Sequence, residues 1–183
     1  MRRSFGVALV VLMFGAAVVA QQGVTGAKST AEAATIKTEA EKCSRAFIAG
    51  DFGRVIDSTY PRLIEMSGGK TELLKEIEKS MKAIRDAGLK MVSHAVGEPE
   101  PSVRAGAMLL SVVPTTLKME SPDSFLTSPS FWLAVSTNDR KSWTFIDGSF
   151  LNPESLKIIL PEAVDKIKLH VKGQLVIERK PAG

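Results

Sequence analysis

The sequence has a single cysteine among 183 residues, so an intrachain disulfide cannot form. It has only two histidines, and no HExxH, CxxC or carboxylate–histidine cluster with ligand spacing occurs, so no metal site is indicated. Aromatic residues make up 6% of the chain, and no basic stripe with interleaved aromatics is present, which argues against a nucleic-acid partner. We therefore expect no metal, no other cofactor and no nucleic acid.

The longest uncharged apolar run, residues 5–20, is shorter than the roughly 20 residues that a helix needs to span a bilayer. Arg2 and Arg3 precede this run, and Val18 and Ala20 stand where a signal peptidase reads small residues. This layout is typical of a secretory signal peptide, and the alternative is an uncleaved membrane anchor. We expect cleavage and a secreted or periplasmic protein that meets the membrane only through its signal segment.

Helical spacing of apolar residues covers the first half of the chain. The first predicted helix spans about residues 31–48 and carries Cys43 on its apolar stripe, where a core role is favoured over a catalytic thiol. Asp51 is placed to cap a second short helix, which Pro61 interrupts. Residues 63–66 are expected to add one turn, and a third helix is predicted from about residue 71 to residue 87.

From residue 89 the spacing changes to the alternation that is typical of strands. Four strand segments are predicted: KMVSHAVGEP, VRAGAMLLSVV, SFWLAVST and KSWTFIDGS. Residues 121–129 are expected to form a long loop, and Asn152-Pro153 to begin a short helix. The tail alternates again around Lys172-Gly173, which predicts a closing hairpin.

This order of elements predicts an α+β fold, with three N-terminal helices packed on one face of a curved antiparallel sheet of four or more strands. A short C-terminal helix and a hairpin follow the sheet. The predicted organisation is a signal peptide (1–20), a flexible leader (21–30), an α+β domain (31–160) and a hairpin tail (161–183).

The stretch FIAGDFGRVIDSTYPRLIEMSGG, the third helix and the four-stranded meander together resemble the nuclear-transport-factor-2-like superfamily, which has a cystatin-like cone fold. The resemblance covers about residues 31–150. It implies a cone-shaped pocket between the helices and the concave sheet. Members include dehydratases, isomerases and epoxide hydrolases, besides non-catalytic binding and dimerising domains. Related enzymes often place a tyrosine in the pocket, which would be Tyr60 here; the alternative is a partly buried tyrosine that anchors the short helix.

The stretch STNDRKSW, residues 136–143, resembles the Asp-box S-x-D-x-G-x-T-W of sialidase-type propellers. Ser136, Ser142 and Trp143 match the pattern, whereas Arg140 stands at the glycine position. In those propellers the box stabilises a hairpin away from the catalytic centre, and it recurs once per blade. A single copy in a chain of this length therefore predicts a structural turn between two strands.

Trp143, Phe145 and Asp147 alternate, so they are predicted to share one face of a strand. If that face is concave, the Asp147 carboxylate would lie beside apolar groups and could act as an acid or base. The favoured interpretation is that Asp147-Gly148 ends the strand in a turn, because Asp-Gly is a turn signal in its own right. His94 lies within a predicted strand, where it is more often a satisfied residue than a ligand. The candidate pocket residues are Tyr60, His94, Trp143, Phe145 and Asp147, and none is assigned as catalytic.

These patterns favour an exported, non-catalytic module that binds a small apolar or amphipathic molecule or another protein. A homodimer formed through the outer face of the sheet is compatible with them. The alternative is a small-molecule lyase, isomerase or hydrolase with an acid or base in the cone pocket.

Overall fold

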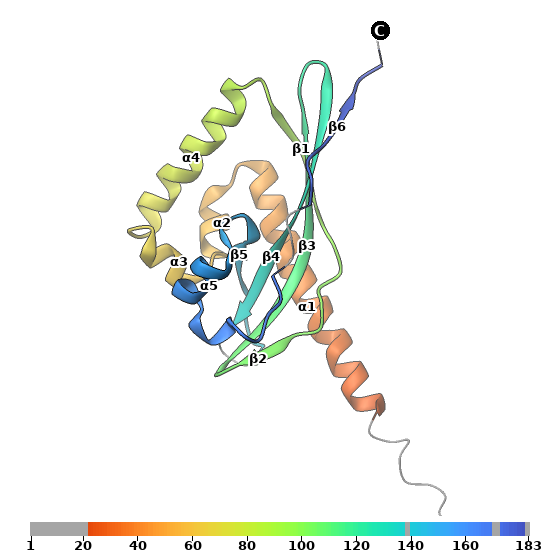
Figure 1. The fold of residues 1–183 in the computed structure, drawn as a ribbon, viewed down its shortest axis with the longest axis vertical. Helices are drawn as coiled ribbons and strands as arrows, with labels where there is room; N and C mark the ends of the chain where they lie inside the picture. The colour runs from red at the N-terminus through yellow and green to blue at the C-terminus, as the bar shows by residue number, and fades with distance from the viewer. Residues whose placement is uncertain (1–21, 138–139, 170–172, 182–183) are drawn as a thin grey trace, which may run out of the picture.

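The computed structural model of the chain describes residues 22–137, 140–169 and 173–181. It confirms the α+β class: helices pack against a curled antiparallel sheet (Figure 1). The helices are α1 (Gln22–Ala49), α2 (Phe52–Asp57), α3 (Pro61–Met66), α4 (Lys70–Asp86) and α5 (Pro153–Ile159), with short 3-10 helices η1 (Gly148–Phe150) and η2 (Pro161–Ala163). The strands are β1 (Lys90–Val96), β2 (Val103–Ala105), β3 (Met108–Glu120), β4 (Ser124–Ser136), β5 (Thr144–Asp147) and β6 (Val176–Arg179).

Local chemistry explains where the helices begin and end. The Asp51 side chain accepts a hydrogen bond from the Arg54 N–H at 3.3 Å and caps α2, as predicted. Gly50, with φ +75°, ends α1 in the left-handed conformation that favours glycine. Asn152 caps α5 through a reciprocal capping box with Ser155, and Pro153 is the first residue of that helix.

Two helical segments differ from the sequence expectation. Residues 22–30, expected to be a flexible leader, form the first turns of α1. No proline interrupts this stretch, and a glycine in a helix costs only about 1 kcal/mol. The single turn expected at residues 63–66 is the separate helix α3, which begins at Pro61 because proline is well suited to the first helical position.

The two long strands β3 and β4 form the centre of the sheet and pair along their whole length, from Leu109 opposite Ser136 to Glu120 opposite Phe125. At one end of this pair the strand order is β2–β3–β4–β5, and at the other end it is β1–β3–β4–β6. The connection between α2 and α3 extends the sheet beyond β5. The Phe145 N–H donates to the Ser58 carbonyl at 2.8 Å, and the Tyr60 N–H donates to the Phe145 carbonyl at 3.0 Å.

The long loop expected at residues 121–129 is wrong, because β4 already begins at Ser124. Pro129 suggested a loop, since proline cannot donate to a sheet. It lies, however, between the part of β4 that pairs with β6, Ser124–Thr127, and the part that pairs with β5, Trp132–Val135. Neither β5 nor β6 pairs with residue 129, so no N–H donor is needed from it on that side, and β4 continues through the proline.

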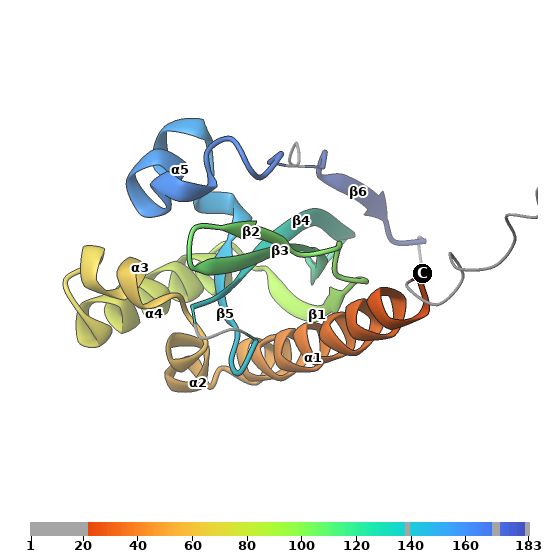
Figure 2. The ribbon, with the colours of Figure 1, turned by 90° about the horizontal axis from the view of Figure 1, so that it is seen from below.

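Helices cover the sheet on two faces rather than on the single face predicted. α1 lies along one face, and α5 lies on the opposite side of the strands (Figure 2). The core on the α1 side consists of Ile36, Ala40, Cys43, Leu109, Val113, Trp132, Ala134, Trp143 and Phe145. The core on the α5 side consists of Tyr60, Ala105, Leu110, Val112, Phe131, Leu133, Val135, Ile146, Leu151, Leu156, Ile159, Leu160 and Ala163. Alternating residues of β4 contribute side chains to the two cores, because successive side chains of a strand point to opposite faces.

The predicted closing hairpin around Lys172-Gly173 is replaced by a longer-range pairing. Residues 164–169 form no strand, and β6 pairs antiparallel with Ser124–Thr127 of β4. Alternation in the tail correctly indicated a strand in residues 176–179. Its partner could not be read from the tail itself, because the partner is the distant β4. Lys172 lies outside the described residues.

The hairpin predicted from the Asp-box pattern is confirmed, since β4 and β5 pair antiparallel. Arg140, at the glycine position of that pattern, has φ +75° and is the only non-glycine residue with positive φ among those the structure describes. The buried Ser136 hydroxyl accepts from the Arg140 N–H at 3.0 Å. The Arg140 guanidinium pairs with Glu32 of α1, which also accepts from Ser102. The turn is therefore fastened to the first helix.

Candidate functional site

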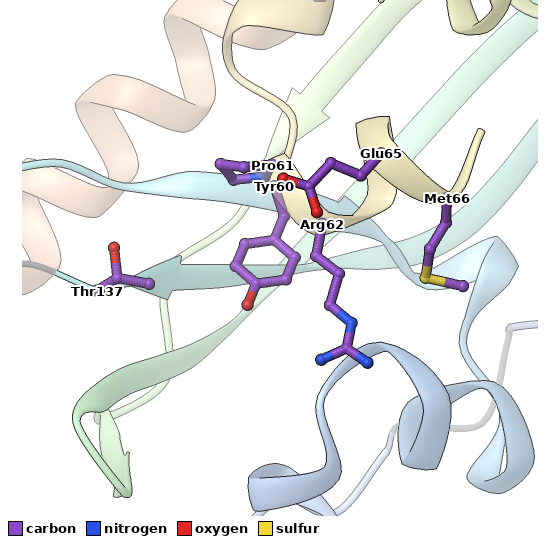
Figure 3. A pocket seen from close by; sticks show the side chains of 6 residues that line it. All are labelled: Tyr60, Pro61, Arg62, Glu65, Met66 and Thr137. Carbon is purple, nitrogen blue, oxygen red and sulfur yellow. The ribbon is translucent and has the colours of Figure 1, made fainter. Parts of the chain in front are cut away.

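An open depression of about 690 Å³ lies beside the start of α3. Pro61, Arg62, Glu65 and Met66 line it from α3, and Thr137 lines it from the end of β4. Tyr60 precedes the helix and completes the lining. Figure 3 shows the Tyr60 and Arg62 side chains extending in the same direction from the start of α3. We call this feature the Tyr60 depression, and its volume falls in the range of small-molecule sites.

Tyr60 is positioned by its backbone and by its ring. Its N–H bond to Phe145 ties it to β5, and its side chain is 9% exposed within the core on the α5 side. The hydroxyl donates to the Met108 sulfur at 3.8 Å, a weak acceptor. Burial raises the pKa of Tyr60, while the nearby Arg62 opposes this shift. The phenol is therefore neutral and can offer a stronger hydrogen bond to a ligand than the one it makes to sulfur.

The rim of the Tyr60 depression carries charge of both signs. Arg62 and Glu65 are exposed, and neither forms an ion pair with the part of the chain that the structure describes. Met66, which is 51% exposed, places an apolar side chain at the same opening. A phenol donor, a thioether and an unpaired guanidinium thus face one space. This combination suits a molecule with an apolar part and a polar head.

A second constellation lies on the α1 side of the sheet around His94. The His94 ring contacts Phe47 of α1, with centroids 5.7 Å apart, and Trp132 of β4, with centroids 4.9 Å apart. Trp132 in turn contacts Phe145 at 5.5 Å. Burial lowers the pKa of His94, and the Asp147 charge partly opposes that shift. The imidazole is therefore held neutral among aromatic rings.

Ser44 defines the tautomer of His94. Its hydroxyl donates to the His94 backbone carbonyl at 2.5 Å, and its oxygen lies 3.1 Å from His94 Nδ1. Because the single hydroxyl proton is directed to the carbonyl, the Ser44 oxygen must accept from Nδ1–H. The lone pair of the neutral ring then resides on Nε2, which has no hydrogen-bond partner among the described residues.

Trp143 and Phe145 share one face, as predicted, and both are buried against α1. The Trp143 Nε1–H lacks a hydrogen-bond acceptor within the described chain. Asp147, on the same strand, is exposed and ends β5: its carboxylate accepts from the Ser149 N–H at 2.7 Å and caps η1. The turn role of Asp147, which the sequence favoured, is also the one that the geometry favours.

Cys43 is buried at 4% exposure on α1, in agreement with its predicted core position. Burial raises the pKa of its thiol to about 11, although a hydrogen bond with Ser58 works in the opposite direction. A thiol with this pKa is almost entirely protonated near neutral pH and is a poor nucleophile.

Of the five predicted pocket residues, Tyr60 is the one that lines the depression. Tyr60 belongs to the core on the α5 side and lines the depression, whereas Trp143 and Phe145 belong to the core on the α1 side. His94 adjoins the latter group through Trp132. The residues missed by sequence reasoning are Arg62, Met66 and Ser44. The only available signal was that Arg62 and Met66 follow Tyr60 closely in the sequence, on the short helix that begins at Pro61, and Ser44 gave none.

Among the described residues there is no group of three or more His, Cys, Asp or Glu side chains that could hold a metal ion. No helix in the described ranges has the length and apolarity needed to cross a membrane. Comparison with models of protein families gave no match. No similar protein was found among curated proteins, and no similar fold among solved structures. The resemblance to the nuclear-transport-factor-2-like superfamily therefore stays a prediction.

Proposed function

We propose that this chain is an exported, non-catalytic binding module that takes a small amphipathic molecule in the Tyr60 depression. The apolar part of the ligand would lie against the Tyr60 ring and Met66. Its polar head would meet the Tyr60 hydroxyl and the Arg62 guanidinium. The observation that carries the proposal is the meeting of a weakly bonded phenol and an arginine that has no ion pair among the described residues, in one opening of about 690 Å³.

The export part of the proposal depends on the layout of residues 1–20, which precede the described chain. A module outside the cytoplasm without a disulfide must be stabilised by its core. The two apolar cores on opposite faces of the sheet are consistent with that requirement.

The enzymatic alternative has less support. A lyase, isomerase or hydrolase of the kind considered above would need an acid or base beside its substrate. Asp147 is exposed and engaged in capping η1, and Tyr60 belongs to the core on the α5 side, whereas His94 packs against Trp132 of the core on the α1 side. Among the described residues, Tyr60, His94 and Asp147 form no hydrogen bond with one another, so no acid–base pair is assembled.

Two probes of equal chain length test the binding proposal: decanoate, with an anionic head, and 1-decanol, with a neutral head. We expect amide chemical shifts near residues 60–66 and 137 to change on titration with decanoate. Arg62→Ala should weaken decanoate binding by about tenfold, the equivalent of about 1.4 kcal/mol, and decanol binding much less. Tyr60→Phe should weaken both, because the hydroxyl can bond either head.

The matched control is Arg85→Ala, which removes an exposed arginine from the last turn of α4, outside the depression. It should leave decanoate binding unchanged. Shift changes that cluster around residues 44, 47 and 94 instead, or equal losses in Arg62→Ala and Arg85→Ala, would refute the depression as the site.

A further inference from the structure

β6 and Leu175, the residue directly before it, carry three consecutive exposed apolar side chains. Leu175, Val176 and Ile177 are 50%, 47% and 61% exposed. Successive residues of a strand point to opposite faces, so β6 is uncovered on both of its faces. Contiguous apolar exposure of this kind is typical of an interaction surface rather than of scattered surface residues.

The strand is fixed in place. Lys180, directly after β6, donates through its ammonium to Glu120 at 2.7 Å and to the Ser121 carbonyl at 2.8 Å. Its N–H donates to the Asp123 carbonyl at 2.8 Å, and the ammonium lies 5.2 Å from the centre of the Phe125 ring. These contacts fasten the end of the chain to the turn between β3 and β4. The apolar side chains are therefore displayed on a pre-organised strand.

The outer edge of β6 is also free. β6 pairs with β4 and with no other strand of the described chain, and it lies at the margin of the sheet beside the β3–β4 turn (Figure 1). An edge of this kind offers a row of backbone donors and acceptors to another strand. Residues 176–179 contain no proline, and the first charged residue is Glu178, so pairing over the apolar run meets no obstacle.

We propose that β6 is a homodimerisation edge, which pairs antiparallel with β6 of a second copy of the chain. A two-fold axis at Val176 sets Val176 opposite its own copy and Leu175 opposite Ile177 of the second copy. Every exposed apolar side chain then faces another across the interface, and such cross-strand pairs stabilise a sheet. The interface is isologous, so it closes as a dimer and does not extend into a filament.

The apolar run favours this register, because it sets apolar side chains opposite one another. With the axis at Val176, Glu178 lies opposite the uncharged Gln174 and Arg179 lies opposite Gly173 of the second copy. An axis at Glu178 would set two carboxylates opposite each other, which is destabilising. The sheet faces are less available to a partner because the described helices cover much of them. A single short strand buries little area, so the dimer is weak and depends on protein concentration.

The first test is sedimentation velocity on purified protein expressed from the full sequence, over a range of concentrations. We expect a monomer–dimer equilibrium that Ile177→Lys shifts to monomer. The matched control is Ile158→Lys on α5, which alters an exposed isoleucine (58%) away from β6 and should leave the equilibrium unchanged. Circular dichroism should confirm that both variants fold.

The second test gives a positive signal and does not depend on disrupting the strand. Val176→Cys places two thiols across the two-fold axis, within disulfide distance in an antiparallel pair. Mild oxidation should yield much more covalent dimer from Val176→Cys than from the control Ile158→Cys. A monomer at every concentration, equal cross-linking of the two variants, or flotation of a monomeric chain with phosphatidylglycerol vesicles would each overturn the proposal.

Discussion

Ser44 and His94 hold each other through two contacts, one to the His94 backbone carbonyl at 2.5 Å and one to the Nδ1 atom at 3.1 Å. The pair joins α1 to the edge strand β1, and Ser44 is only 4% exposed. Replacing Ser44 with Ala leaves a carbonyl and an imidazole N–H without their partner. We expect this variant to lose about 1–3 kcal/mol of stability in urea unfolding. Ser80→Ala, which alters an exposed serine on α4, is the control and should change the stability little.

The lowered pKa of His94 predicts a pH dependence of stability. Because its folded-state pKa lies below the ordinary value of 6.5, the unfolded chain takes up a proton more readily than the folded chain as the pH falls through 6.5. The free energy of unfolding should therefore fall between pH 8 and pH 5.5, by at most about 1.4 kcal/mol, because pH 5.5 lies one unit below the ordinary pKa. Urea unfolding at both pH values measures the effect.

The comparison should be made in a His170→Gln background, so that His94 is the only histidine that titrates. Adding His94→Gln should flatten the dependence over this pH range. Glu120 and Asp123 have lowered pKa values, but as carboxylates they affect stability only below their ordinary values of 4.5 and 3.8. An unchanged slope after His94→Gln would contradict the assignment.

Cys43 should react slowly in the folded protein. Its burial excludes reagents, and its pKa of about 11 leaves little thiolate at pH 8. Reaction with 5,5′-dithiobis-(2-nitrobenzoate), followed by absorbance, should be far slower in buffer than in concentrated urea. Modification at the rate of a free thiol in native conditions would show that Cys43 is accessible.

The effect of Arg140→Gly on stability should depend on whether Glu32 is present. Its left-handed backbone costs about 1–2 kcal/mol relative to glycine, but its guanidinium pairs with Glu32, whose side chain is only 7% exposed. Arg140→Gly alone should destabilise, since it leaves a buried carboxylate unpaired. In a Glu32→Gln background the same change should be neutral or should stabilise by about 1 kcal/mol. A double-mutant cycle by thermal unfolding measures the coupling, and additive effects would exclude it.

Position 148 requires glycine because its backbone passes close to Phe131, and not because of its φ angle. A Cβ at this position would lie 2.6 Å from the Phe131 carbonyl oxygen and 2.7 Å from its ring. Gly148→Ala should therefore cost about 1–3 kcal/mol through overpacking. Gly53→Ala in α2 is the control: its Cβ would meet Asp51 at an ordinary 3.7 Å, and alanine favours helix. It should raise the melting temperature slightly, whereas equal effects of the two changes would contradict the close contact.

Much of the local structure was predictable because it depends on neighbouring residues. Capping by Asp51 and Asn152, the stop at Gly50 and the hairpin around residues 136–143 all follow from side-chain chemistry within a few positions. The burial of Cys43 followed from its place on an apolar stripe. Predictions failed where the outcome depended on residues far away in the chain. Pro129 indicated a loop, but it lies within β4, between the segment that pairs with β6 and the segment that pairs with β5.

The candidate site was predictable only in part, for the same reason. Alternation placed Trp143 and Phe145 on one face correctly, but it could not show that α1 covers that face. Tyr60 was predicted through a family resemblance, whereas no motif in the sequence marks its neighbours Arg62 and Met66, which line the depression with it.

The amino-acid sequence by itself determined the α+β class, the positions of most helices and strands, and which side chains share a face. These properties depend on spacing and on short-range backbone bonds. Only the tertiary structure decided that helices cover two faces of the sheet, that the tail joins β4, and that Tyr60 belongs to one core while His94 packs beside the other. Those outcomes depend on contacts between residues far apart in the chain, which no local pattern encodes.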